Sequence, residues 1–469
     1  MTDPGERPTR ISTTSRPDGQ RAIDRAAAAR PVPGNKVSLL QDAEALTAML
    51  SVIARATRFI HFENYIIRDD PTGWRFAEAL AARAREGIAV RVLYDWLGSM
   101  NTGRKFWRFL REAGCEVRAF GPPSLLRPLR MISRDHRKLV VADGALAVVG
   151  GLCIADEWAG DPEKGIPPWR DTALLIEGPA SHALDIAFAR IWARTGRPLP
   201  DDERAVDVPP VGDAAVRVVV GEPGKERAYR VLEYLAAGCR RRLWVVDAYF
   251  IPPQRLFEVL ALAEKDGVDI RFLVPGSSDV PLLRNLTRIG YRDLLRAGIR
   301  IFEWNGPMIH GKTMVADGRW VRIGTSNINA SSLTGNYELD LVVEDPELAR
   351  TMEHQFRRDL GASAEVVRHK RRAPRALAKV IPSRLEARSA TELPKRRGRR
   401  ELRARTLIAA RRLMTAAFRS VVGPISLGLL VLGVLFLGLP KIMGYVFGGL
   451  CLWFALATGL QLWRRRDST

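Results

Sequence analysis

The sequence predicts an α/β protein made of two copies of one folding unit, followed by a helical hairpin that inserts into a membrane. Three observations support this prediction. A strand-and-helix plan occurs twice between residues 35 and 363, a short polar motif recurs at the same place in each copy, and two uncharged apolar stretches lie near the C-terminus. Of the 469 residues, 46% are hydrophobic and 27% are charged, which allows sizeable cores and excludes global disorder.

The N-terminal region, residues 1–35, is rich in Pro, Arg, Thr and Ala and has no apolar run of the kind that a signal peptide needs. We therefore expect a disordered tail there. The four cysteines of the chain are scattered without a CxxC spacing, which argues against a disulfide scaffold and against a zinc ribbon. We expect no metal and no cofactor.

The duplicated unit begins with a short apolar run that contains an acid and then a tyrosine, as expected of a buried strand. Helices and further strands then alternate, with a glycine ending each helix, which favours an α/β fold. Two copies are expected to pack as a pseudo-dimer with a site at their shared seam. We place the first copy at residues 36–205 and the second at 206–363. The matching segments are 59–67 with 243–251, 74–86 with 253–266, 87–93 with 267–273, and 113–117 with 297–301.

The most specific signal is the motif HxKx4D, which occurs once in each copy. The residues between its Lys and Asp are mostly apolar, which predicts a strand with His and Lys on one face and Asp in the following turn. Two motifs at matching places, in a chain with six histidines, argue against coincidence. We expect structural roles for the other four histidines. The motif residues are His136, Lys138 and Asp143 in the first copy, and His310, Lys312 and Asp317 in the second.

The paired motifs resemble those of the phospholipase D superfamily, and several stretches resemble bacterial cardiolipin synthases in particular. The resemblance covers roughly residues 38–360. It implies two phospholipase D-like α/β/α halves and a metal-independent enzyme that transfers a phosphatidyl group through a covalent phosphohistidine. The stretches that carry it are Tyr94–Ser99, His136–Lys138 with Asp143 and Gly144, Gly150 and Gly151, Ile154–Trp158, and Trp169–Asp171.

The motif residues suit phosphodiester chemistry. Lys138 and Lys312 supply fixed positive charge to the phosphate oxygens and stabilise the charge that builds up in the transition state. One neutral imidazole attacks phosphorus, and the other, protonated, donates to the leaving alkoxide. The resemblance favours His136 as the nucleophile and His310 as the acid and base, while the duplication leaves the reverse assignment open.

Each catalytic imidazole needs a partner that fixes its tautomer. Aligning the two copies pairs Asp171 with Glu338, since both enter an apolar strand. Glu338 also matches the carboxylate that orients a catalytic histidine in the family that the chain resembles. The alternative for both is an exposed acid at the start of a strand. Asp143 and Asp317 complete the catalytic motif, but we expect them to hold turns rather than to carry protons.

A turn of small residues follows each motif and offers a phosphate donor. Asn327 in the second copy can donate its amide to a phosphate oxygen. The first copy has Cys153 where the family usually has Asn, and a thiol is a much weaker donor. The two halves are therefore expected to grip phosphate unequally, unless a backbone N–H replaces the missing amide.

Most of the chain's positive charge precedes the apolar stretches. Residues 364–420 hold 18 Lys and Arg against 4 Asp and Glu, which leaves residues 1–363 only mildly basic within a total net charge of +21. We interpret 364–420 as a basic linker on anionic headgroups and 421–463 as two transmembrane helices. A re-entrant hairpin and a buried hairpin remain alternatives. The basic flanks, including the tail 464–469, predict a multi-pass inner-membrane protein whose catalytic body faces the cytoplasm.

The leading hypothesis from the resemblance is a cardiolipin synthase-type phosphatidyltransferase acting between two phosphatidylglycerol molecules. Its partners would be anionic phospholipids, namely phosphatidylglycerol and cardiolipin, and the bilayer. The segment 121–132 is either a packed loop or a lip that enters the bilayer. Alternatives are a hydrolytic phospholipase D, a nuclease, and a scaffold with a decayed site. The mildly basic charge of residues 1–363 argues against a nucleic-acid partner. The sequence does not indicate an oligomeric state.

Overall fold

The computed structural model describes residues 18–123, 133–203, 207–279 and 281–367, together with residues 445 and 452. The chain divides into two units at residue 372, and the α/β fold belongs to the first. The predicted hairpin 421–463 (those two residues apart), the tail 464–469, the linker beyond residue 367 and the lip segment from residue 124 to 132 lie outside the described residues. In the described part of the chain, no helix is both long and apolar enough to cross a bilayer.

The first half alternates strands and helices as the duplication predicts. Its elements are α1 (Asp18–Ala27), β1 (Val32–Gln41), α2 (Ala43–Arg55), β2 (Phe59–Asn64), α3 (Pro71–Arg85), β3 (Ala89–Asp95), α4 (Arg104–Glu112), β4 (Glu116–Phe120), β5 (Lys138–Ala142), β6 (Leu146–Gly150), α5 (Asp156–Ala159), η2 (Pro162–Lys164), β7 (Thr172–Glu177), α6 (Pro179–Thr195) and η3 (Asp201–Glu203).

The second half repeats this order from β8 onward, with one extra strand at its end. Its elements are β8 (Ala214–Gly221), α7 (Arg227–Gly238), β9 (Arg242–Val246), α8 (Gln254–Lys265), β10 (Asp269–Pro275), α9 (Pro281–Arg296), β11 (Arg300–Trp304), β12 (Thr313–Ala316), β13 (Trp320–Gly324), η4 (Ser331–Gly335), β14 (Glu338–Glu344), α10 (Pro346–Gly361) and β15 (Ser363–Glu365). The basic linker expected from residue 364 thus starts inside the sheet, because β15 pairs antiparallel with β11.

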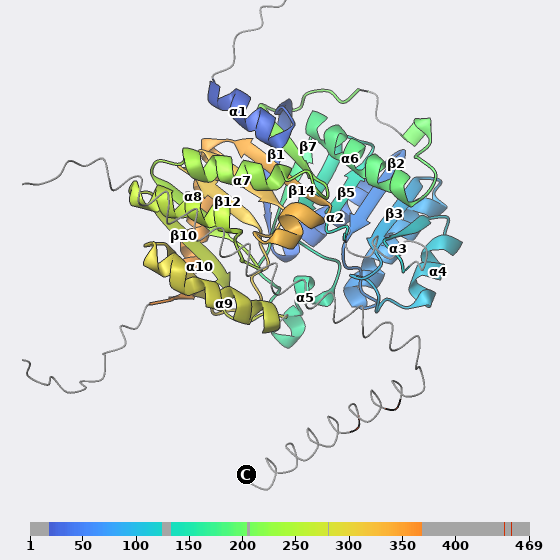
Figure 1. Ribbon diagram of the computed structural model, residues 1–469. Coiled ribbons are helices and arrows are strands. Elements are labelled where there is room, and N and C mark those ends of the chain that lie inside the picture. Colours follow the sequence, from blue (N-terminus) through green and yellow to red (C-terminus); the bar gives the residue numbers. More distant parts are fainter. Residues whose placement is uncertain are drawn as a thin grey trace, which may run out of the picture. The chain divides into compact units, whose positions relative to one another are not determined.

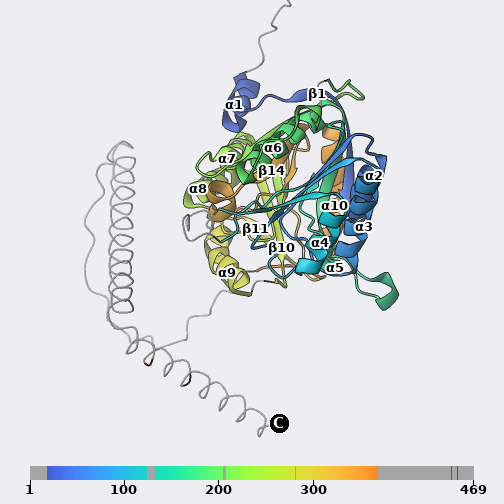
Figure 2. The same ribbon diagram turned by 90° about the vertical axis from the view of Figure 1, so that its right-hand side faces the viewer.

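The strands of the two halves form one continuous sheet. Its order is β15-β11-β10-β9-β12-β13-β14-β8-β1-β7-β6-β5-β2-β3-β4. Without β15, this order reads the same for the two halves outward from the centre, where β1 and β8 pair antiparallel. Helices lie on both sides of the strands (Figures 1 and 2): α6 and α10 pack against the apolar cluster that the two halves share, whereas α2 and α7 pack against the separate clusters of the first and second half. The predicted duplication is therefore a pseudo-twofold arrangement around the β1–β8 seam.

Three large apolar clusters hold this arrangement together. One lies in the first half and includes Val92 and Val140, and a second lies in the second half and includes Phe272. The third contains residues of both halves, such as Leu174 and Leu341, both fully buried. Burying apolar surface is the main driving force for such packing, so the shared cluster fixes the two halves against each other.

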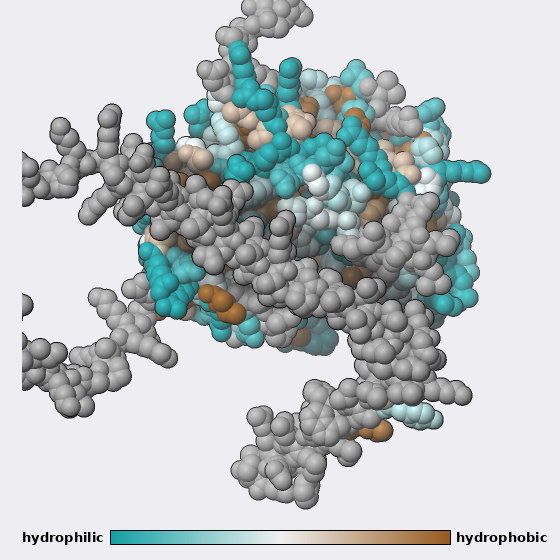
Figure 3. Space-filling view, in the orientation of Figure 1, coloured by the Kyte–Doolittle hydropathy of each residue, from teal (hydrophilic) through white to brown (hydrophobic). Residues whose placement is uncertain are grey.

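The surface is mostly hydrophilic on the face of Figure 3, where apolar residues form small separate patches over the described part of the chain. One such patch lies where Figure 1 shows α9. That helix carries Ile289, which is 73% exposed.

The expectation of a disordered tail over residues 1–35 is wrong from residue 18 onward. Helix α1 buries Ile23 and Ala27 in the apolar cluster of the second half. Asp24 accepts a hydrogen bond of 2.7 Å from the Arg217 guanidinium. Ile23 and Ala27 are four residues apart and share one helix face, but the polar composition of the region conceals this short amphipathic pattern. The segment from Val32 then supplies the central strand β1.

The aspartates of both motifs hold turns. Asp143 and Asp317 adopt positive φ values of 54° and 56° between antiparallel strands. The Asp143 carboxylate accepts backbone N–H bonds of 2.8–2.9 Å from residues 57–59, and Asp317 accepts bonds of 2.8–3.1 Å from residues 240–242. Burial alone would raise their pKa values, but these donors lower both. The two carboxylates thus tie each motif strand to the start of β2 or β9.

His61 also has a structural role, as expected for a histidine outside the motif. Its fully buried ring lies between the rings of Phe59 and Phe188, at centroid distances of 4.7 and 4.6 Å. Nδ1 lies 2.6 Å from Asp185 Oδ1, and Nε2 lies 3.7 Å from Glu203 Oε2. Burial favours the neutral ring, but the two carboxylates outweigh it and raise the pKa of His61. The imidazolium therefore links β2 to α6 and η3.

We predict that His61→Gln lowers the free energy of unfolding by roughly 2–4 kcal/mol, because it leaves buried carboxylates without their cation. A raised pKa in the folded state adds stability that is complete below the unfolded pKa and is lost as pH rises through the folded pKa. The difference between wild type and variant should therefore be full below about pH 6.5 and should shrink as pH rises above it in denaturant titrations. The exposed control His354→Gln should change stability by less than about 0.5 kcal/mol. A His61 effect that is independent of pH would contradict the charged assignment.

Candidate active site

Both motif histidines line one cleft of about 700 Å³ at the seam between the halves. The wall includes a tyrosine from each half, at equivalent places in the duplication. The Tyr65 ring contacts the His136 ring edge-on at a centroid distance of 4.9 Å, and the Tyr249 and His310 rings are 6.0 Å apart. Cys153 and Asn327, one from each of the small-residue turns that follow the motifs, also line this cleft.

Each histidine is held in place by the backbone of the other half. The His136 N–H donates to the Tyr337 carbonyl at 3.0 Å, and the His310 N–H donates to the Arg170 carbonyl at 2.7 Å. These bonds belong to two short parallel bridges, Asp135 with Tyr337 and Arg170 with Ile309. The expectation that His and Lys share a strand is therefore wrong, because His136 precedes β5 and both His310 and Lys312 precede β12, which begins at Thr313. The backbone of each histidine pairs across the seam instead.

The residue that follows each of these β-bridges carries a carboxylate, which lies against the motif histidine of the other half. Glu338 follows Tyr337, and its Oε2 lies 3.0 Å from His136 Nδ1. Asp171 follows Arg170, and its Oδ2 lies 2.7 Å from His310 Nδ1. Because Nδ1 faces the carboxylate in both rings, Nε2 is the nitrogen left for chemistry in the cleft. Sequence alignment of the copies identified the two carboxylates, but it did not indicate that they exchange partners.

Both carboxylates are themselves held by further donors. Glu338 accepts hydrogen bonds from the hydroxyls of Thr325 and Ser332. Asp171 accepts from Trp158 Nε1 at 3.0 Å and from the Thr172 N–H at 2.7 Å. Burial would raise the pKa of each carboxyl, but the facing histidine and these donors lower both. Each carboxylate is thus kept ionised and in a fixed orientation.

A glycine beside Asp171 leaves room for its carboxylate. A Cβ placed on Gly151 would lie 2.2 Å from Asp171 Oδ1. This contact is far too short for any side chain, so the second glycine of the Gly150-Gly151 pair is required by the close approach of the carboxylate.

The motif lysines are fully buried beside the histidines. Lys138 Nζ donates to the His136 carbonyl at 2.6 Å, and Lys312 Nζ donates to the His310 carbonyl. Burial lowers the pKa of Lys312 to about 8, and the positive charge of Lys138 adds to this effect against the opposing influence of Asp171. The two ammonium groups therefore influence each other across the seam, as expected for charges around one anion site.

The same surroundings favour neutral imidazoles when the cleft holds no anion. Burial lowers the pKa of His310 to about 4, with a further contribution from Lys312. Burial also lowers the pKa of His136, although Glu338 opposes it. A neutral ring with Nδ1–H bonded to a carboxylate carries its lone pair on Nε2, which is the state that a nucleophile needs.

Of the remaining candidate residues, two line the cleft and two lie in turns. Asp143 and Asp317 lie outside the cleft lining, in the turns at the far ends of β5 and β12, where they hold the turns as expected. Asn327 is 4% exposed, and its Oδ1 accepts no hydrogen bond within the described protein. Cys153 is 1% exposed, and burial raises the pKa of its thiol, which keeps it protonated. The two turns thus place a thiol in one wall of the cleft and an amide in the other.

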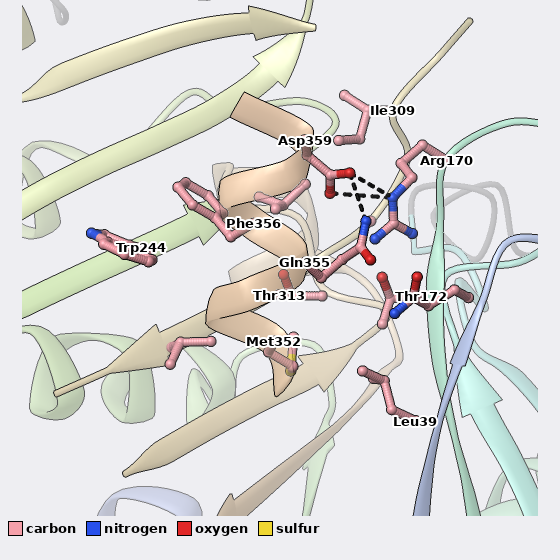
Figure 4. Close-up of a pocket in the computed structure, with 14 residues that line it drawn as sticks. Leu39, Arg170, Thr172, Trp244, Ile309, Thr313, Met352, Gln355, Phe356 and Asp359 are labelled. Atoms are coloured by element: carbon pink, nitrogen blue, oxygen red, sulfur yellow. Dashed lines mark hydrogen bonds and ion pairs between the residues drawn. The ribbon is translucent and has the colours of Figure 1, made fainter. Parts of the chain in front are cut away.

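Arg170 is a positioning residue that sequence reasoning did not single out, although it stands in the quoted stretch Trp169–Asp171. Its Nε donates to Asp359 at 3.2 Å, and its Nη1 donates to Asp42 at 2.9 Å and to the Asp171 carbonyl at 2.7 Å. Figure 4 shows Arg170 and Asp359 of this cluster with Gln355, which donates to Asp359 at 2.7 Å, beside a cavity of about 20 Å³. These interactions hold in place the backbone that carries Asp171.

Over the described ranges, no group of His, Cys, Asp and Glu side chains is arranged to hold a metal ion.

Comparisons with known proteins agree with this geometry. Residues 233–360 match the family described as cardiolipin synthase, PLD-like domain. A cardiolipin synthase of Staphylococcus aureus is 33% identical over 326 residues, covering 68% of this chain and 66% of that protein. The major cardiolipin synthase of Bacillus subtilis is 34% identical over 337 residues, covering 70% of this chain and 69% of that protein.

The chain thus spans about two thirds of the length of these relatives. Among solved structures, a phosphatidylserine synthase from Haemophilus influenzae shares the fold, with a TM-score of 0.59 and 16% identity over 75% of this chain and 92% of that one. The paired motifs, the shared cleft and the sequence identity together show that the chain belongs to the cardiolipin synthase family of phospholipase D-like proteins.

Proposed function

We propose that the protein transfers a phosphatidyl group from one phosphatidylglycerol to another, forming cardiolipin and releasing glycerol. The observation that carries this proposal is the single cleft in which two histidines, each held by a carboxylate of the other half, lie beside two buried lysines. The relatives that share this family are named cardiolipin synthases, which supplies the substrate class.

The reaction has two displacements at phosphorus. In the first, Nε2 of His136 attacks, a phosphorus–nitrogen bond forms, and the bond to the glycerol oxygen breaks while protonated His310 donates a proton to that oxygen. In the second, His310 takes the proton from the hydroxyl of a second phosphatidylglycerol, whose oxygen attacks phosphorus and releases His136. One phosphodiester is consumed and one is formed, so the exchange needs no outside energy source.

The charges in the cleft fit this cycle. With no anion bound, burial and the lysines keep the imidazoles neutral. A bound phosphodiester brings a negative charge that offsets Lys138 and Lys312 and raises the pKa of the histidine that must act as the acid. The lysines then stabilise the additional charge on the phosphate oxygens in the transition state. Substrate binding and protonation are therefore coupled.

The proposal includes the membrane arrangement predicted from the sequence. Residues 421–463 would anchor the protein in the inner membrane, with the catalytic body on the cytoplasmic side and residues 368–420 on anionic headgroups. The nearest competing function is hydrolysis, in which water replaces the second lipid hydroxyl. Both functions use the same first displacement, so the products decide between them.

Incubation with phosphatidylglycerol labelled with ³²P should yield labelled cardiolipin in excess of phosphatidic acid. Both His136→Asn and His310→Asn should lower turnover by at least about 10³-fold, because each removes one proton-transfer or nucleophilic group. Rapid quenching should trap ³²P on His136 in the His310→Asn protein but none in the His136→Asn protein. The exposed control His354→Asn should behave as wild type. Label on His310 would reverse the assignment, and phosphatidic acid as the main product would favour hydrolysis.

The pKa of Lys312 predicts an alkaline limit to activity. Since kcat/KM reports the free enzyme, it should fall as pH rises through about 8, where Lys312 loses the positive charge that the phosphate needs. Asp171→Asn removes a negative charge that raises the pKa of Lys312, so this limb should move to lower pH. The partly exposed control Asp161→Asn, which lies outside the cleft, should leave the limb in place. A limb that stays fixed or moves upward in Asp171→Asn would contradict this electrostatic assignment.

A further inference from the structure

The two halves differ in how the space between two equivalent helices is filled, namely α3 and α4 in the first half and α8 and α9 in the second. In the first half, Trp74 of α3 packs edge-on against Phe106 and Phe109 of α4, with ring centroids 5.1 and 5.3 Å apart. Its indole N–H donates to Asp69 at 2.8 Å. The three aromatic rings close the gap between α3 and α4.

The equivalent space in the second half is an open groove of about 160 Å³ between α8 and α9. Aligned on Gly87 and Gly267, which follow α3 and α8, Trp74 corresponds to Gln254. Aligned on Gly114 and Gly298, which follow α4 and α9, Phe106 and Phe109 correspond to Gly290 and Asp293. All three replacements line the groove. The loss of three aromatic side chains at matching positions explains why it is open.

The groove has an apolar floor and polar groups at its rim. Phe250 and Leu294 on the floor are each 2% exposed, and Phe257 lies beside them. The rim groups interact along their own helices, since Gln254 donates to Glu258 at 3.1 Å and Asp293 pairs with Arg296 at 3.1 Å. The floor therefore offers apolar contact to an occupant that has no hydrogen-bonding groups of its own.

The groove adjoins the catalytic cleft, because Ile251 lines both. We infer that it binds an acyl chain of the glycerophospholipid whose phosphate lies between the two histidines. This inference rests on the proposed function, since it takes the occupant of the cleft to be a phosphatidyl lipid. An unbranched methylene chain suits a narrow space between two helices, and each buried methylene contributes favourably to binding.

Filling the groove provides the test. Gln254→Trp restores the residue that the first half has at this place. Gly290→Phe restores a second ring, and it should be tolerated because a Cβ at Gly290 meets no atom within 4 Å. The two variants of the full-length protein are compared with wild type on dibutanoyl and dioctanoyl phosphatidylglycerol below their critical micelle concentrations. Both should reduce the preference in kcat/KM for the longer chain by about tenfold, with little change for the shorter lipid.

A matched control comes from the same helix. Leu262 of α8 is 60% exposed and lines neither space, so Leu262→Trp adds the same ring without filling the groove and should keep the wild-type preference. The thermal unfolding temperature of each variant shows whether a loss of chain preference comes from filling the groove or from misfolding. Fluorescence of 11-(dansylamino)undecanoic acid gives a readout independent of catalysis, and both filling variants should weaken its binding.

The outcomes separate this inference from the proposed function. If wild type transfers no phosphatidyl group, the proposed function fails, while binding of the dansyl probe still reports on the groove. If both filled variants fold and keep the wild-type chain preference and probe binding, the acyl-chain inference is overturned. Equal losses on the short and long lipids would also overturn it, because they would point to the headgroup or to the cleft itself.

Discussion

Each catalytic histidine takes its orienting carboxylate from the other half, and this crossing determines how the two halves must be placed against each other. Glu338 orients His136 and Asp171 orients His310, so each imidazole takes its partner from the other half. This exchange requires the two halves to be fixed within hydrogen-bonding tolerance. The continuous sheet through β1 and β8, the shared apolar cluster and the two short bridges all serve that requirement.

The site also concentrates groups that are costly to bury. Two lysines, two histidines and two carboxylates lie at or below 8% exposure around one cleft. Burial of charge is tolerated when it is paired and hydrogen-bonded, and in this cleft the lysines donate to the histidine carbonyls while hydroxyl, indole and backbone donors hold the carboxylates. The two ammonium groups and the two carboxylates balance in charge, while burial favours neutral imidazoles. Under the proposed function, the negative charge of the phosphodiester is added to this balanced set and raises the pKa of the histidine that acts as the acid.

Much of this could be predicted from the sequence, because the duplication is local and regular. The strands and helices of both copies, the turns at Asp143 and Asp317, and the pairing of Asp171 with Glu338 all follow from matching one copy to the other. The crossing of the carboxylates could not, since it depends on the seam, which brings together residues 139 and 202 positions apart. Helix α1 was missed because two apolar residues in a polar region give a weak signal, and the buttress at Arg170 depends on Asp42 and Asp359 from distant segments.

The symmetric strand order has a further consequence for how such a chain could arise. A single-copy ancestor that paired with itself along the β1 edge would already present two histidines, two lysines and two exchanged carboxylates in one cleft. Joining the two copies in one gene then releases each from the need to remain identical. The half with Trp74 and its neighbouring rings is closed, while the other has Gln254, Gly290 and Asp293 at the matching places and is open. Gene fusion therefore allows the two halves to differ in their outer helices while the catalytic side chains keep their positions.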